Sequence, residues 1–428
     1  MRRALWLMAI TALNTGGLFV YQWFVVTRLG AGQGTDALFA GMVMPQLVLN
    51  VISGSLGYVL IPLLTVVDRK HRVSSIWSFA MALALIFGSL AGVLWLLAPW
   101  WVPLSVPGFD ADAVAQTVTL TRIQLLGMVF AGLGAPFNAA YQAEHRFIYP
   151  AFMQMLAGLL ALAFVVMFLG HGGVEIAAWG LTLRAVLQCL FQTPVGFPFA
   201  APNFKDEHFV SALRRLKPLV AGTIYYKTDQ LLDRFLASMT PSGSLSLLHL
   251  AQQIYAAGNL VLTNAIAMPM TPRLAKHADE GEWGAFRHEV RRVLGILMAL
   301  GVLALALTVF PGRYVLELVF ARGNLSVASV DTLWHIMLAL GMVWLSGLSG
   351  QVLSSSFYAM SDTKTPTRIG VIGFTLGIGL KIVGLLLGGV IGVAIGSGVY
   401  MVFNSVAMYF ILFRRLDGSA SLSREGQR

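Results

Sequence analysis

Residues 218–239 read PLVAGTIYYKTDQLLDRFLASM. This stretch is long enough to cross a bilayer as one helix, yet four ionisable side chains lie near its middle. They are Lys227, Asp229, Asp233 and Arg234. On a helical wheel these side chains share one arc with Tyr226 and Gln230. A charge at the centre of a membrane helix costs at least ~2.5–3.5 kcal/mol, so it normally faces a partner or a water-filled cavity. The stretch therefore predicts a polar pathway inside a bundle of membrane helices.

Two other interpretations of this stretch remain open: an amphipathic helix of a soluble domain, and a set of structural ion pairs with no role in transport. The composition of the 428-residue chain weighs against the first. The chain is 57% hydrophobic and 11% charged, with a mean hydropathy of +0.75, whereas soluble domains are about 25% charged. Long apolar runs also exclude a β-barrel, whose strands give alternating segments of about 10 residues. The sequence therefore predicts an all-α polytopic membrane protein.

Apolar runs separated by short polar connections predict about twelve transmembrane helices. They cover residues 5–28, 36–67, 75–98, 113–141, 150–169, 176–195, 218–239, 245–271, 293–310, 330–360, 367–387 and 390–413. The first run lacks a convincing cleavage site, so we expect it to be retained as a span. When Arg28 and Arg368, at span ends, are counted with the adjoining connections, 21 of the 29 Lys and Arg residues lie in connections that this topology places inside, three lie outside and five lie within spans. This asymmetry predicts cytoplasmic termini and explains the net charge of +10 without nucleic acid as a partner.

The two halves of the chain resemble each other. Residues 53–62 (SGSLGYVLIP) align with 263–272 (TNAIAMPMTP), and 126–130 (LGMVF) align with 340–344 (LGMVW), at offsets of 210 and 214. Shared apolar composition is the alternative explanation. The alignment predicts two six-helix lobes, residues 1–205 and 206–428, in the same orientation across the membrane. In transporters built this way the substrate site lies between the repeats near the midplane.

Several short motifs occur in a fixed order along the chain. They include GTDALF at 34–39, PGF at 107–109, RFIYPAF at 146–152, GSLS at 243–246 and DTKTP at 362–366. Together they resemble the MurJ/MviN lipid II flippase family, within the multidrug/oligosaccharidyl-lipid/polysaccharide exporter superfamily. The resemblance implies two lobes around a central cavity and alternating access in the bacterial inner membrane. It implies an undecaprenyl-pyrophosphate-linked saccharide as substrate, contact with membrane lipids, and cell-wall or polysaccharide synthesis proteins as candidate partners.

The chain departs from the family at the cavity. The resemblance implies arginines from spans 1, 2 and 8, but the corresponding positions here are Thr15, Tyr21, Asn50 and Gln253, and only Asp36 is retained. The resemblance also implies two further C-terminal spans, which we expect this chain to lack. A pyrophosphate that leaves water needs cationic or N–H partners, so we hypothesise that span 7 supplies the missing charge. The predicted substrate-binding residues are Asp36, Asn50, Tyr226, Lys227, Gln230, Arg234 and Gln253.

Asp229 and Asp233 lie one helical turn apart, so they could share a proton or a sodium ion and couple it to transport. Alternatively they only neutralise Lys227 and Arg234. Lys381, in span 11, either extends to the membrane surface or pairs within its lobe.

No enzyme signature is present. The sequence contains no phosphate-binding G-x-x-x-x-G-K-[ST] motif and no G-x-S-x-G, and its eight His and one Cys show no metal-ligand spacing. We therefore expect a transporter that is not an enzyme and has no metal or cofactor apart from a coupling ion. The main alternative to a flippase is an ion-coupled multidrug exporter of cations, and a membrane glycosyltransferase is a third class. A net cationic cavity favours the flippase, and a net anionic cavity favours the cation exporter.

Overall fold

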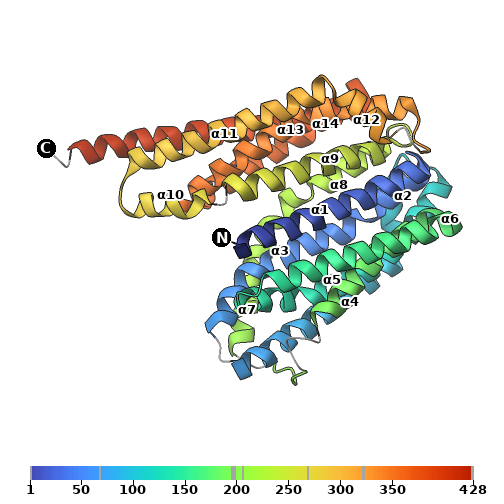
Figure 1. Cartoon of the computed structure of the whole chain (residues 1–428), viewed down its shortest axis with the longest axis horizontal. Helices are drawn as coiled ribbons and strands as arrows, with labels where there is room; N and C mark the ends of the chain where they lie inside the picture. Colours follow the sequence, from blue (N-terminus) through green and yellow to red (C-terminus); the bar gives the residue numbers. More distant parts are fainter. Residues whose placement is uncertain are drawn as a thin grey trace. The chain divides into compact units, whose positions relative to one another are not determined.

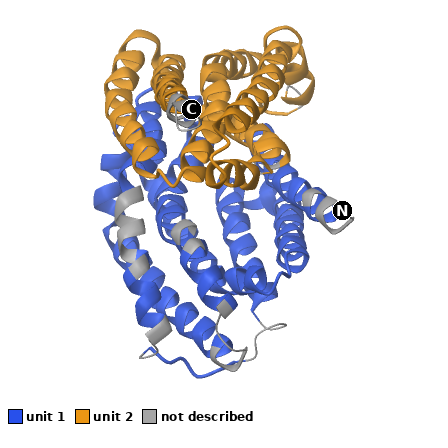
Figure 2. Ribbon diagram, turned by 90° about the vertical axis from the view of Figure 1, so that its left-hand side faces the viewer, with its two compact units in different colours: residues 1–246 blue, residues 247–428 orange. Residues whose placement is uncertain are grey.

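The computed structural model describes residues 2–66, 69–193, 199–204, 207–267, 269–320 and 323–425, which form helices and contain no strand (Figure 1). The predicted all-α fold is confirmed. The chain forms two compact units, Met1–Ser246 and Leu247–Arg428 (Figure 2). These units are defined by packing within each part, and the lobe boundary between residues 205 and 206 stays a prediction.

The first unit contains eight complete helices and the start of a ninth, within the residues described. They are α1 (Arg2–Leu29), α2 (Gln33–Gly41), α3 (Val43–Val66), α4 (Arg69–Ser105), α5 (Ala111–Ala143), α6 (Ile148–Gln192), α7 (Glu207–Lys227), α8 (Asp229–Ser238) and the beginning of α9 (Ser244–Leu262). Its core joins α3, α4 and α5 through buried side chains such as Leu60, Phe87 and Phe137. Phe209 of α7 belongs to the same core. The charged seventh span is therefore continuous with a helix that packs on α3 and α4.

The second unit continues α9 and adds a short π-helix. Its further elements are η1 (Thr263–Ala267), α10 (Met270–Asp279), α11 (Trp283–Val309), α12 (Gly312–Phe320), α13 (Val327–Ala359) and α14 (Lys364–Glu425). Helix α13 packs against both α11 and α14, and it buries Leu333, Leu348 and Phe357. Helix α10 follows the predicted eighth span.

Eight segments of the described chain are long and apolar enough to cross a membrane. Two of them, α6 and α14, each reverse direction at a glycine: Gly173 has φ 56° and Gly389 has φ 57°. The reversals show in the packing, because Gly180 lies against Val165 within α6. Each of these two helices therefore supplies two of the predicted spans. The less apolar pairs α7–α8 and α9–η1 occupy the predicted seventh and eighth spans, so the twelve predicted spans all correspond to helical segments.

Backbone features of α5 and α6 recur in α13 and α14 at a constant separation of 216 residues. The equivalent positions are Asp110 and Ser326, His145 and Ser361, and Gly173 and Gly389. The first pair caps a helix N-terminus through a side-chain oxygen. The second pair ends a helix with a positive φ of 56° or 58° in a non-glycine residue, and the third pair reverses the chain. The duplication inferred from sequence at offsets of 210 and 214 thus has a counterpart in the backbone, at a slightly larger offset.

The two arms of α14 touch through their backbones. A Cβ built on Gly384 would lie 2.1 Å from the carbonyl oxygen of Gly392, and one built on Gly396 would lie 2.7 Å from the carbonyl oxygen of Leu380. Small residues allow this close approach between membrane helices. Lys381 lies in this contact, fully buried, with its ammonium nitrogen 5.3 Å from the centroid of the Tyr400 ring. Of the two expectations for Lys381, extension to the membrane surface is therefore wrong.

Asp362 joins the start of α14 to its far end. Its carboxylate accepts hydrogen bonds from the Thr365 hydroxyl (2.6 Å), from the Thr365 backbone N–H (3.0 Å) and from the Arg415 guanidinium (2.5 Å). The Thr365 hydroxyl is the largest cause that holds the pKa of Asp362 at about 2, below its ordinary value of 3.8. The DTKTP motif is therefore a clamp that closes the α14 hairpin at its open end.

We expect Asp362→Asn to lower the free energy of unfolding at pH 7 by about 1 kcal/mol, because the clamp is partly solvent-exposed. Since the pKa is depressed in the folded state, the contribution is present above 3.8 and is lost as the pH falls towards about 2. Thermal unfolding in detergent at pH 7, and between pH 4 and pH 2, measures this difference. The gap between wild type and variant should close in that range, while Asp279→Asn, at an exposed aspartate, should show no gap. A gap that stays constant with pH would contradict the assignment.

Candidate functional site

The charged stretch is broken in its middle. Helix α7 ends at Lys227 and α8 begins at Asp229, and the Thr228 hydroxyl donates to the carbonyl oxygen of Tyr225 at 2.6 Å. The predicted single, uninterrupted helix is therefore wrong at Thr228. A Lys at the C-terminal end of one helix and an Asp in the first turn of the next both complement the helix dipoles. Irregular backbone at membrane depth is tolerated where it lines a cavity.

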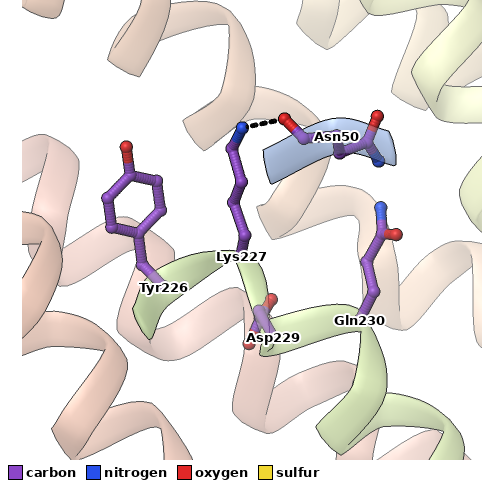
Figure 3. A pocket seen from close by; sticks show the side chains of 5 residues that line it. All are labelled: Asn50, Tyr226, Lys227, Asp229 and Gln230. Atoms are coloured by element: carbon purple, nitrogen blue, oxygen red, sulfur yellow. Dashed lines mark hydrogen bonds between the residues drawn. The ribbon is translucent and has the colours of Figure 1, made fainter. Parts of the chain in front are cut away.

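A pocket of about 430 Å³ lies at this break (Figure 3). Its lining residues are Asn50, Tyr226, Lys227, Asp229 and Gln230. In Figure 3, Lys227 and Gln230 extend from the break toward Asn50 on α3, and the Lys227 ammonium donates to the Asn50 carbonyl oxygen. Lys227 is 11 residues from the end of α8 at Ser238, which corresponds to about 17 Å, roughly half of the ~30 Å hydrocarbon layer. Five of the residues predicted from sequence thus meet in one pocket near the middle of a span.

The other two charges of the stretch lie outside the pocket. Asp233 and Arg234 are 4% and 5% exposed, one helical turn farther along α8. The Arg234 guanidinium interacts electrostatically with Asp233 and with Asp36. Lys227 is therefore the one cation among the described residues that line the pocket, and Arg234 has the surroundings expected of a structural ion pair.

The carboxylate of Asp36 is fully engaged in hydrogen bonds within the protein. It is 2% exposed, and its carboxylate accepts from the backbone N–H groups of Gly243 (2.6 Å) and Ser246 (2.7 Å) and from the Ser246 hydroxyl. These donors surround the first turn of α9, so Asp36 caps that helix from α2. Gly243 has φ 91°, and a Cβ there would lie 2.7 Å from the Ala31 carbonyl oxygen, so this turn requires glycine. The geometry gives Asp36 a structural position away from the pocket.

Three further positions singled out by the family resemblance also lie outside the pocket lining. Gln253 is partly buried on α9, in the second unit. The Thr15 hydroxyl donates to the Thr11 carbonyl oxygen of its own helix at 3.0 Å. The Tyr21 hydroxyl donates to the Ala177 carbonyl oxygen and so ties α1 to α6. Both hydroxyls therefore serve internal hydrogen bonds at positions where the resemblance implies basic residues.

The sequence did not indicate a contact between Arg184 and Asn14. The Arg184 Nη2 atom donates to the Asn14 Oδ1 atom at 3.1 Å across 170 residues of chain. The available signal was that Arg184 is one of few basic residues within a predicted span.

The comparisons with known proteins decide the family. The sequence model of the lipid II flippase MurJ family matches residues 25–423. The chain belongs to the lipid II flippase MurJ family. Similar relatives include the probable lipid II flippase MurJ of Haemophilus influenzae, 24% identical, with 89% of this chain and 80% of the relative covered. The lipid II flippase MurJ of Burkholderia cenocepacia is 25% identical, with 91% and 79% covered. The resemblance stated from motifs is confirmed.

Two solved structures share the fold of this MurJ-family chain. A lipid II flippase MurJ in an inward closed conformation gives a TM-score of 0.83 at 16% identity, covering 95% of this chain and 87% of the other. An inward-facing multidrug resistance transporter of the MATE family gives 0.76 at 15% identity, covering 98% and 99%. At these identities the likeness shows the fold. The chain is a multi-pass protein of the bacterial inner membrane, in a family of transporters.

Proposed function

We propose that this chain moves a polyprenyl-pyrophosphate-linked saccharide, lipid II foremost, across the inner membrane by alternating access. The observation that carries the proposal is the family match over residues 25–423. The pocket at the Thr228 break supports it, because a charged headgroup needs a polar path while its lipid tail stays in the bilayer. The proposed lobes are residues 1–205 and 206–428, with both termini in the cytoplasm.

The pocket chemistry suits a pyrophosphate attached to a sugar. Lys227 has three N–H donors and uses one on the Asn50 carbonyl oxygen. No carboxylate lies within 4 Å of its ammonium among the described residues, so two donors remain for phosphate oxygens. The side-chain amides of Asn50 and Gln230 and the hydroxyl of Tyr226 can bond sugar hydroxyls. Arg234 and Asp36 would hold the surrounding helices in place, and Gln253 would contact cargo from α9.

A second candidate function is the ion-coupled export of cations. Asp229 lines the pocket together with Lys227, so the charges lining the pocket sum to zero and do not choose between anionic and cationic cargo. The fold likeness to a multidrug resistance transporter also fits this alternative. In either case Asp229, with Asp233 one turn away, is the proposed site for a coupling proton or sodium ion. No other cofactor and no catalytic step are proposed, and cell-wall or polysaccharide synthesis proteins are the proposed partners.

Reconstitution of the purified chain in liposomes tests the two candidates side by side. One arm follows a fluorescent lipid-linked disaccharide pyrophosphate by its accessibility to a membrane-impermeant quencher. The other follows uptake of a cationic dye under a proton or sodium gradient. Protein-dependent movement of the lipid, with no dye uptake, is the expected result. Gradient-dependent dye uptake without lipid movement would replace the flippase with the cation exporter.

A further inference from the structure

Arg184 lies where three helical segments of the first unit meet. It is on the second arm of α6, and its Nη2 atom donates to Asn14 on α1 at 3.1 Å. Gly158, on the first arm of α6, lies beside this contact. A Cβ built there would lie 3.7 Å from Arg184 Nε and 3.8 Å from Asn14 Oδ1. The guanidinium is therefore held beside a neutral amide oxygen.

The charge of Arg184 is not balanced by a carboxylate. No Asp or Glu oxygen lies within 4 Å of it in the part of the chain that the structure describes. By contrast, the Arg234 guanidinium interacts with Asp233 and Asp36. Arg184 is 11 residues beyond the reversal at Gly173, about 17 Å along the helix, which places it near mid-membrane. A charge at this depth normally faces a partner or water, and is a functional-site candidate.

The fold itself does not require a cation at this position. At the 216-residue repeat, the residue equivalent to Arg184 is Tyr400, which is neutral and buried. The Tyr400 ring faces the ammonium of Lys381, which is also buried. Arg184 is only partly buried, unlike both of these residues. Space is open on the neighbouring helix, since a Cβ built on Gly17, one turn after Asn14, would meet no atom within 4 Å. The Arg184 guanidinium, with its several N–H donors, is therefore not fully enclosed by protein.

We infer that Arg184 is an anion-binding residue for the phosphate oxygens of the lipid-linked cargo, and that Asn14 orients it. The inference rests on the proposed function and adds a second cation to the one at Lys227. A guanidinium offers five N–H donors in a planar fork that matches phosphate oxygens. The Asn14 oxygen engages one nitrogen and leaves the others for the ligand. Because Asn14 is neutral, it fixes the side chain without cancelling its charge.

The test compares full-length variants reconstituted in liposomes, using lipid-linked disaccharides joined through a pyrophosphate, a monophosphate or an uncharged glycerol linker. Arg184→Gln should lower the initial rate for the pyrophosphate lipid about tenfold and leave the uncharged lipid unchanged. Arg184→Lys should retain part of the rate. Arg122→Gln is the matched control, since Arg122 also lies in a membrane helix but stacks on Trp95, 4.3 Å from the ring centroid. It should leave the rate unchanged.

Asn14→Asp separates anion binding from a structural role. A carboxylate at this position would pair with Arg184 and hold the helices at least as firmly, yet it would cancel the charge that the cargo needs. We expect an unchanged or higher melting temperature together with about tenfold slower movement of the pyrophosphate lipid. This variant and Arg184→Lys decide the question if Arg184→Gln fails to fold.

Transport within twofold of wild type in Arg184→Gln or Asn14→Asp would overturn the inference, as would equal losses for the charged and uncharged lipids. If the wild-type chain moves none of the lipids, the proposed function fails on its own. The inference is then decided by calorimetric binding of inorganic pyrophosphate. Binding that is about tenfold weaker in Arg184→Gln supports it, and equal binding overturns it.

Discussion

Lys227→Met is expected to lower the movement of a polyprenyl-pyrophosphate saccharide by about tenfold or more. Lys227 is the one cation on the described pocket lining, and its ammonium is anchored to the Asn50 carbonyl oxygen. Methionine keeps the length and apolar stem of the side chain but removes every N–H donor. A phosphate that enters the pocket would then lose its charge-assisted hydrogen bonds. Initial rates in liposomes, with equal amounts of folded protein, measure the effect.

Three companion variants make this result specific. Lys227→Arg keeps the charge and should retain much of the rate. Lys276→Met removes an exposed lysine of α10 and should change nothing. Asp229→Asn removes the pocket anion and should leave the binding of phosphate unchanged. If the chain were a cation exporter, the same variant should abolish transport of a cationic dye. Full lipid transport by Lys227→Met would remove this pocket from the headgroup path.

The helical wheel of residues 218–239 predicted part of the site because helix periodicity is a local property. It placed Tyr226, Lys227 and Gln230 on one arc, and the structure finds all three on the pocket. It also placed Arg234 there, although that side chain is buried elsewhere. Gln230 and Arg234 share one face of α8, but Arg234 lies one turn farther along the helix, where it is buried. How far a pocket extends along a helix depends on the packing of neighbouring helices and has no periodic signal.

Apolar runs separated by short polar connections predicted the spans well. The turns near Gly173 and Gly389 were both expected, since glycine at positive φ allows the chain to reverse. Contacts across long stretches of sequence could not be predicted in the same way. Asp36 meets Ser246 across 210 residues, and Arg184 meets Asn14 across 170. Each partner is an ordinary polar residue, and only the packed helices bring them together.

Asp36→Ala should give the largest loss of stability, about 3 kcal/mol, because two backbone N–H groups and one hydroxyl would lose their buried acceptor. Asp36→Asn should lose less. It keeps one oxygen toward Ser246 but turns an N–H₂ group toward the Gly243 N–H, so two donors would face each other. Thermal unfolding in detergent ranks the three proteins, with Asp112→Ala, at an exposed aspartate of α5, as a control expected to stay within about 0.5 kcal/mol of wild type.

Hydrogen exchange locates the effect of the Asp36 variants. The amides of Gly243 and Ser246 donate directly to the carboxylate, so they should lose protection in Asp36→Ala before the rest of α9 does. If Asp36 bound the cargo, Asp36→Ala would give the opposite result. Transport would be lost, while the melting temperature and the hydrogen exchange at these two amides would stay as in wild type. The two roles are distinguishable because a carboxylate that already accepts three buried hydrogen bonds cannot turn toward a ligand without uncapping α9. A variant that abolished transport with α9 fully protected would therefore refute the structural assignment and return Asp36 to the substrate path.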